Sequence, residues 1–183
     1  MRPLPLLLFL IAIPFVSFQF EEDKDRGSFT AVIDNKPFKV REDQLYRGLV
    51  MAKAGSMDGK SPARNVISAT FNGPSYDLKD GRSFSENIWV EVDFALPFEA
   101  GSAHNFSVSS QFDGTNYFML KEQSTINITD VAWESDKKHF RLNADIKCKM
   151  RSMGYPADGK RDVVLQSKMT SIRITVPSWL AKS

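Results

Sequence analysis

The feature that most constrains this chain is a strict two-residue alternation of apolar and polar side chains near its C-terminal end. From Phe140 to Arg151 every even-numbered position is apolar and every odd-numbered position is polar. Successive side chains of a β-strand point to opposite faces, whereas a helix would need apolar residues every three or four positions. The segment is therefore predicted to be a long strand with one buried face. Cys148, the only cysteine, lies on that face and is predicted to be a small buried hydrophobe.

The same period recurs along most of the chain and predicts an all-β fold. The segment 41–55 fits either a strand or a short helix, and Asn72-Gly73-Pro74 is expected to stop a strand. Asp34–Pro37 and the Asp-Gly pairs are typical of hairpin turns. We expect a single antiparallel β-sandwich or flattened barrel of about nine to ten strands after an N-terminal signal segment. The clearest strands are predicted over 28–33, 65–71, 88–96, 106–112, 116–120, 126–133, 140–151, 163–169 and 172–176.

The N-terminal residues indicate where the protein is delivered. Arg2 precedes an apolar run from Leu4 to Phe20, and acidic residues follow. A basic start and a short apolar run are typical of a secretory signal peptide. We predict a signal peptide, or an uncleaved anchor, over 1–20 and a secreted or periplasmic, cell-envelope location, with membrane contact only if the leader is uncleaved. An acidic linker (21–26), a β domain (27–177) and a C-terminal tail (178–183) are predicted to follow.

The sequence contains no catalytic motif. His104 and His139 have no spacing that selects a nucleophile or a metal partner, so both are expected in loops or at the surface. Glu91 and Asp93 lie beside Trp89, and paired carboxylates are typical of glycoside hydrolases. Residues two apart on one strand point the same way, however, and flank a substrate poorly. We predict no catalytic residues, no cofactor and no metal, and an enzyme with an unrecognised site is the least favoured alternative.

Charge is distributed unevenly, although the net charge is only +2. Residues 65–136 contain three basic and eleven acidic residues, whereas 137–183 contain eleven basic and three acidic ones. Cross-strand pairing and a basic face that docks an anionic partner both remain open. An anionic glycan or an envelope protein is the expected partner, and nucleic acid is not. The candidate anionic-partner face is the odd-numbered side of the longest strand: Arg141, Lys147, Lys149 and Arg151, with Glu91 and Asp93 the best candidates to neutralise it.

Exposed aromatic residues offer another route to a ligand. Trp89 and Trp133 fall near polar stretches, and Trp179 follows the last predicted strand. Such side chains can stack on sugar rings, and packing within a Phe-rich β protein is the alternative. A secreted binding module for a partner or glycan is therefore the first expectation. A lipocalin-like barrel that holds a small apolar ligand is the second.

Two stretches of the sequence resemble a known group of proteins. The first is Gly27–Phe38, with the order GSFTAVIDNKPF, and the second combines Ile126–Thr129, Asp136-Lys137-Lys138 and Asp158-Gly159-Lys160. This pattern is similar to that of small β-rich envelope or secreted proteins of the Bacteroidetes. The resemblance implies the all-β fold and the extracytoplasmic compartment, and it implies no activity and no site residues. The group includes many lipoproteins, but this chain lacks their anchoring cysteine.

Overall fold

The computed structural model describes residues 27–41, 47–55, 63–77, 81, 83–153 and 161–180. The predicted signal peptide (1–20) and linker (21–26) lie outside the described residues, as do 181–183 of the predicted tail. All regular structure in the described part is β, which confirms the predicted all-β class. The strands are β1 (Ser28–Ile33), β2 (Lys36–Phe38), β3 (Arg47–Lys53), β4 (Arg64–Asp77), β5 (Ser83–Asp93), β6 (Phe106–Phe112), β7 (Thr115–Trp133), β8 (His139–Ser152) and β9 (Asp162–Thr175).

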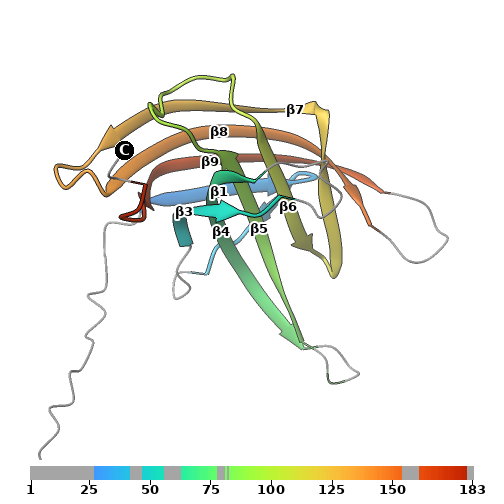
Figure 1. Ribbon diagram of the computed structural model, residues 1–183. Coiled ribbons are helices and arrows are strands. Elements are labelled where there is room, and N and C mark those ends of the chain that lie inside the picture. The colour runs from blue at the N-terminus through green and yellow to red at the C-terminus, as the bar shows by residue number, and fades with distance from the viewer. Residues whose placement is uncertain are drawn as a thin grey trace, which may run out of the picture.

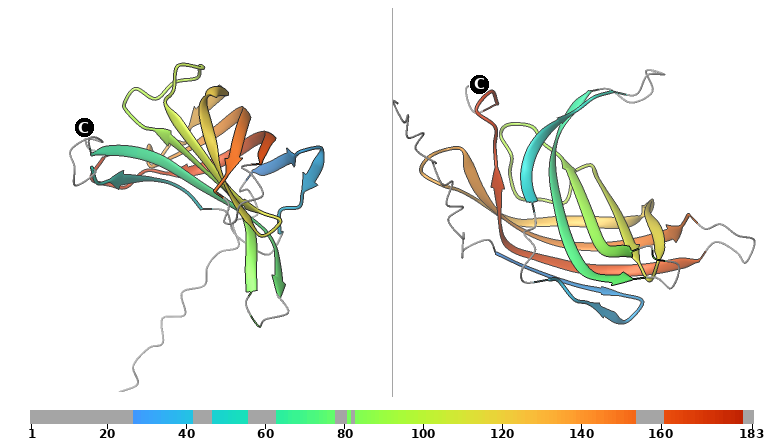
Figure 2. Two further views of the ribbon diagram at one scale, coloured as in Figure 1. Left: turned by 90° about the vertical axis from the view of Figure 1, so that its right-hand side faces the viewer. Right: turned by 90° about the horizontal axis from the view of Figure 1, so that it is seen from below.

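The strands form one mixed sheet that curls back on itself. Strands β3 to β9 pair with their neighbours in chain order, and β9 returns to pair with β3. Strand β1 pairs with β9 along the same edge as β3, but nearer the N-terminal end of β9. Strand β2 then extends the sheet on the far side of β1. Strands β7, β8, β9 and β1 lie side by side as one curved layer, which β4 and β5 cross steeply (Figure 1). Figure 2 shows β3 and β4 rising from this layer. The architecture is a flattened barrel with a hairpin added at its seam.

The seam of this barrel is narrow. In the described part of the chain, strand β3 meets β9 through one parallel residue pair, Leu49 with Thr175, and the other strand pairings are antiparallel. At this point a Cβ atom on Gly48 would lie 2.6 Å from the carbonyl oxygen of Arg173. A glycine at position 48 therefore allows the two backbones to approach closely enough to close the ring.

The inward face of the sheet forms one continuous hydrophobic cluster. The even-numbered residues from Phe140 to Met150 are all at most 3% exposed, which confirms the two-residue period. Cys148 is fully buried among them, as predicted, and burial raises the pKa of its thiol to about 12. Aromatic rings fill one end of the interior, where Phe98 packs against Phe94 and Phe140. Side chains thus occupy the space between the curled parts of the sheet.

Several predicted boundaries were wrong, and irregular pairing is the common reason. Strand β4 continues through Asn72-Gly73-Pro74, because a register shift between Asn72 and Ser75 lets the strand accommodate Pro74. Strand β7 joins 116–120 and 126–133 across a similar shift, and β9 joins 163–169 and 172–176 with Ser171 at a φ of 56°. The ambiguous segment 41–55 contains strand β3, at 47–53.

Two predicted hairpin turns are confirmed. Asp34 and Asn35 connect β1 to β2, and Asp113 and Gly114 connect β6 to β7. All four residues have positive φ, the backbone of a type I′ turn, whose twist matches that of the flanking strands. Asp34 also accepts hydrogen bonds from Arg161 and from the backbone of Val164, which ties this turn to β9. The pairs Asp58-Gly59 and Asp158-Gly159 lie outside the described residues.

Candidate functional site

The predicted basic row lies along the outward face of β8, and the structure neutralises most of it. Arg151 donates from Nε and Nη2 to the two carboxylate oxygens of Asp162, at 2.7 and 3.0 Å. Lys149 Nζ lies 3.3 Å from the same carboxylate. Hydrogen bonding from Arg151 is the main cause that lowers the pKa of Asp162 to about 2. Arg141 Nε lies 3.6 Å from Glu134. Three of the four predicted residues thus have carboxylate neighbours.

Glu91 and Asp93 contact residues outside the basic row, so the suggestion that they neutralise this row was wrong. They lie on β5, where Glu91 contacts Lys53 of β3 at 2.5 Å and Asp93 contacts Arg64 of β4 at 2.5 Å. Asn105 also donates to Asp93 at 2.8 Å. Both carboxylates are therefore engaged by neighbouring side chains on an ordinary strand face, as their spacing suggested.

Lys147 is the member of the basic row that lacks a carboxylate neighbour in the described part of the chain. Within the described residues neither Lys147 nor Lys168 has an ion-pair partner, and both side chains are exposed. Lys147 lies opposite Gln166, and Lys168 lies opposite Asp145. The two lysines are thus diagonal neighbours across β8 and β9, a position that corresponds to roughly 7–8 Å between their backbones.

These lysines line a pocket of about 1100 Å³ that we call the β1 trough, and apolar side chains that include Phe29, Phe38 and Phe71 line it as well. Two rows of side chains cross it on the outward face of the curved layer. One row runs from Thr125 on β7 through Lys147 and Gln166 to Val32 on β1, and the next combines Asn127, Asp145, Lys168 and Thr30. Ammonium, amide, hydroxyl and carboxylate groups therefore share one concave surface. These groups can bind an anionic ligand that also carries hydroxyl groups.

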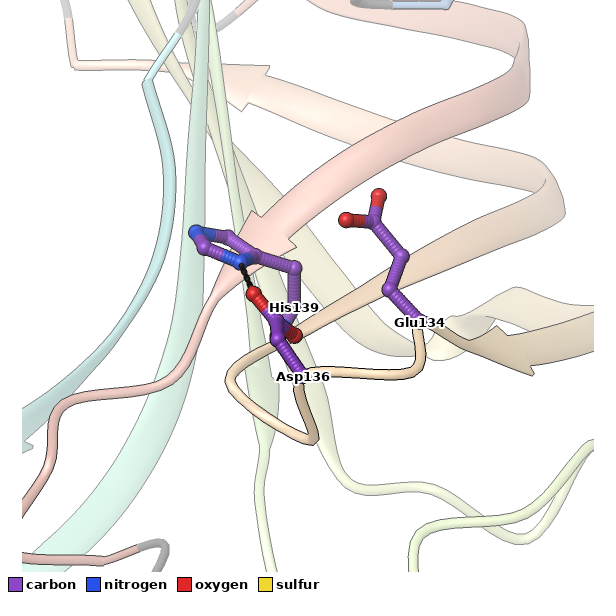
Figure 3. A group of neighbouring side chains, drawn as sticks. All are labelled: Glu134, Asp136 and His139. Carbon is purple, nitrogen blue, oxygen red and sulfur yellow. Dashed lines mark hydrogen bonds and ion pairs between the residues drawn. The ribbon is translucent and has the colours of Figure 1, made fainter.

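A second cluster of polar residues closes the turn between β7 and β8 (Figure 3). Ligand atoms of Glu134, Asp136 and His139 lie within 4.8 Å of one another, as in a metal site. The Glu134 carboxylate, however, accepts two hydrogen bonds of 2.9 Å from Arg173, which lower its pKa. Two guanidinium groups, from Arg173 and Arg141, thus lie beside the carboxylate and oppose the binding of a cation.

The other carboxylate of this cluster holds the turn itself. Asp136 accepts hydrogen bonds from the backbone N–H groups of Lys138 and His139, at 2.8 and 3.1 Å. Its second oxygen lies 2.5 Å from Nδ1 of His139. The hydrogen bond from Lys138 is the largest cause that lowers the pKa of Asp136, and that from the His139 side chain is next. The geometry is that of a side chain that caps a tight turn.

His104, the second histidine considered in the sequence, contacts Glu99 and Phe98 of its own loop. Its Nε2 donates to the carbonyl oxygen of Glu99 at 3.0 Å, and its ring packs 5.0 Å from that of Phe98. The side chains of His104 and His139 therefore contact residues of the loop or turn beside them.

Sequence reasoning missed the residues of β9 and β1 that complete the trough. Gln166 and Lys168 lie on the polar side of an alternating strand, which is a usable signal, but only the pairing of β9 with β8 brings them beside Lys147. The cluster around Asp136 was also missed, and its signal was the short spacing of Glu134, Asp136 and His139 around a turn.

Comparison with known proteins supplies no relative for this chain. No protein-family model matches it, and neither a curated protein nor a solved structure shows significant similarity. In the described part of the chain, no helix is long and apolar enough to cross a membrane.

Proposed function

We propose that this protein is a secreted or periplasmic binding protein without catalytic activity, and that the β1 trough binds an acidic saccharide of the cell envelope. The observation that carries the proposal is the pair of exposed lysines, Lys147 and Lys168, which are diagonal neighbours in the lining of a large concave surface. An ammonium group that has no carboxylate partner is available to a ligand anion.

The neighbouring side chains favour a carboxylated sugar over a densely charged polymer. Asp145 is the direct cross-strand neighbour of Lys168, so the two rows that cross the trough carry two positive charges and one negative charge, and Arg41 lines the trough elsewhere. A polyphosphate or heavily sulfated chain would be repelled by this carboxylate. A chain of uronic acids presents fewer charges and many hydroxyl groups, which Gln166, Asn127 and Asp145 can bind.

The alternative of a barrel that encloses an apolar ligand needs a hollow interior. The inward-facing side chains that also line the trough, Phe29, Phe38, Phe71 and Ile146, instead belong to one buried cluster and are at most 8% exposed, whereas the lysines lie on the outward side. The extracytoplasmic location rests on the leader sequence of residues 1–20. Mass spectrometry of the protein recovered from its native cells would test it, because a cleaved leader shortens the chain by a defined mass.

Binding to polygalacturonate, an acidic polysaccharide, is the direct test of the trough. We expect binding at low ionic strength that weakens as salt is added, because screening acts over about 8–10 Å near physiological salt. The double variant Lys147→Glu/Lys168→Glu should lose at least tenfold in affinity, equal to about 1.4 kcal/mol.

The control variant makes the same change in net charge at positions far from the trough. Lys138 is exposed and lies nine positions before Lys147, which corresponds to about 30 Å along an extended chain. The double variant Lys137→Glu/Lys138→Glu should bind almost as the parent protein does. Equal losses in both double variants would show that net charge alone is responsible, and absence of any salt-sensitive binding by the parent protein would refute the proposal.

A further inference from the structure

A second surface, distinct from the trough, carries four amide side chains in register. On the outward face of β4 to β7, Asn72 pairs with Asn87, Asn87 with Gln111, and Gln111 with Asn116. None of the four is buried. Adjacent strands lie about 4.8 Å apart, so the row is about 14 Å long. Each amide offers an acceptor and two donor hydrogens, and a row of them can match a series of sugar hydroxyl groups.

Aromatic rings lie in the next row on the same face. Trp89 on β5 and Phe118 on β7 flank Ser109 on β6, with Thr70 of β4 on the other side of Trp89. Trp89 is 48% exposed and Phe118 is 44% exposed. The indole Nε1 of Trp89 donates to Ser68 Oγ at 3.0 Å, which fixes an exposed ring in place. A ring held in this way loses little further freedom when a ligand stacks on it.

This combination of a fixed indole and a row of amides fits a sugar ring. The C–H bonds on one face of a pyranose form an apolar surface that can pack against the electron-rich face of an indole. Hydroxyl groups at the edge of the same ring need donors and acceptors beside it. We propose that the outward face of β4 to β7, which we call the Trp89 face, binds neutral saccharide units with Trp89 as the stacking platform.

Charge on this face favours a neutral ligand. The two amide and aromatic rows between β4 and β7 contain no charged residue. Two charged side chains that border these rows in the described part of the structure are engaged, Glu91 with Lys53 and Arg151 with Asp162. Among the side chains that the structure describes, an acidic saccharide would find no unpaired cation in these two rows, in contrast to the trough. The Trp89 face therefore does not depend on the proposal made for Lys147 and Lys168.

A protein partner is the competing occupant of an exposed tryptophan. The cores of protein interfaces are enriched in aromatic, Met and Arg side chains and depleted in Ser. Around Trp89 the nearest cross-strand neighbours on this face are Thr70 and Ser109, and the next row is made of amides. This hydroxyl-rich and amide-rich setting matches a hydrated sugar better than an apolar protein surface.

Native electrophoresis through gels that contain a soluble polysaccharide tests the proposal with the full chain. The probes are soluble β-glucan, xylan, mannan and dextran, and titration calorimetry with the retained polysaccharide gives the affinity. We expect at least one neutral polysaccharide to slow the protein. Trp89→Ala should weaken that binding about thirtyfold, as removal of a central aromatic anchor does. Trp89→Phe should keep part of the affinity, because it keeps a ring.

Three further variants distinguish the loss of stacking from misfolding and from an effect of the trough. Trp179, which is 57% exposed beyond β9, gives the matched control Trp179→Ala, which should bind as the parent does. Gln111→Ala/Asn116→Ala should weaken binding without touching the indole. Lys147→Glu/Lys168→Glu should leave neutral polysaccharide binding unchanged, even if polygalacturonate binding proves absent.

The proposal is overturned if no neutral polysaccharide slows the protein. It is equally overturned if Trp89→Ala, with its fold verified by circular dichroism, binds as tightly as Trp179→Ala. A parent protein that self-associates through Trp89 and binds no sugar would instead identify this face as a protein interface.

Discussion

Replacement of Ser167 by alanine should make the protein more stable. Ser167 lies on the inward face of β9, between Ala31 of β1 and Ile146 of β8, and is only 8% exposed. Its Oγ is the one buried side-chain oxygen or nitrogen in the described residues that has no hydrogen-bond partner. A buried hydroxyl without a partner costs about 1–3 kcal/mol, because its hydrogen bond to water is lost on folding.

The expected gain follows from two opposing effects. Ser167→Ala removes that cost, and it leaves a void of about 15 Å³, which is worth roughly 0.4 kcal/mol at the usual cost per unit of cavity volume. The net effect should be a free energy of unfolding that is larger by about 1 kcal/mol, or a melting temperature higher by about 2–4 °C for a chain of this size. Urea unfolding followed by tryptophan fluorescence measures the first quantity, and calorimetry measures the second.

Buried serines that do have partners supply the controls. Ser110 Oγ donates to the carbonyl oxygen of Asn87 at 3.0 Å, and Ser152 Oγ accepts from the backbone N–H of Arg161 at 2.9 Å. Alanine at either position should lower stability by about 1 kcal/mol, since a hydrogen bond is lost. If Ser167→Ala lost stability as these controls do, the hydroxyl would have a partner in solution and the reasoning would fail.

Three further predictions concern β8 and its neighbours. Cys148 should resist thiol reagents in the native protein and react on unfolding, because it is fully buried with a pKa raised to about 12; native labelling at the rate of a free thiol would contradict this. Ile146→Asp should unfold the domain, whereas Lys147→Asp should change stability by no more than about 0.5 kcal/mol, as circular dichroism melts can show. Asp162 has its pKa lowered from 3.8 to about 2 by Arg151, so its ionised form stabilises the fold above pH 3.8 and this contribution is lost as the pH falls toward 2. Asp162→Asn should therefore be less stable than the parent protein at neutral pH, and acid titration of both should show the difference vanish near the lower pKa.

Local sequence patterns predicted most of the strands, because a strand with one buried face alternates apolar and polar residues whichever strands pair with it. They did not predict where strands continue. Pro74 and the residues near Ser124 break the local pattern, yet the partner strands keep pairing beyond them with a shifted register. The missing information was tertiary, since a bulge is stabilised by the strand beside it.

The candidate sites show the same limit. The basic row was visible in the sequence, but its neutralisation depends on the pairing of β8 with β9, which brings Asp162 to Lys149 and Arg151, and on the turn that returns Arg141 to Glu134. The amide row is likewise assembled from four strands, so no window of sequence contains it. Trp89 could be singled out as an aromatic beside polar residues, and only the register showed what surrounds it.

The single-pair seam between β3 and β9 predicts where the native protein opens locally. Twelve residue pairs join β8 to β9, whereas within the described residues Leu49 with Thr175 is the one pair that joins β3 to β9. Partial opening of a protein follows its least connected boundary, so the ring should open there while β7 to β9 remain intact. Amide hydrogens on the seam side of β3 should then exchange with deuterium well before those of β8. Gly48→Ala, by forcing the two backbones apart, should hold the seam open and accelerate that exchange further.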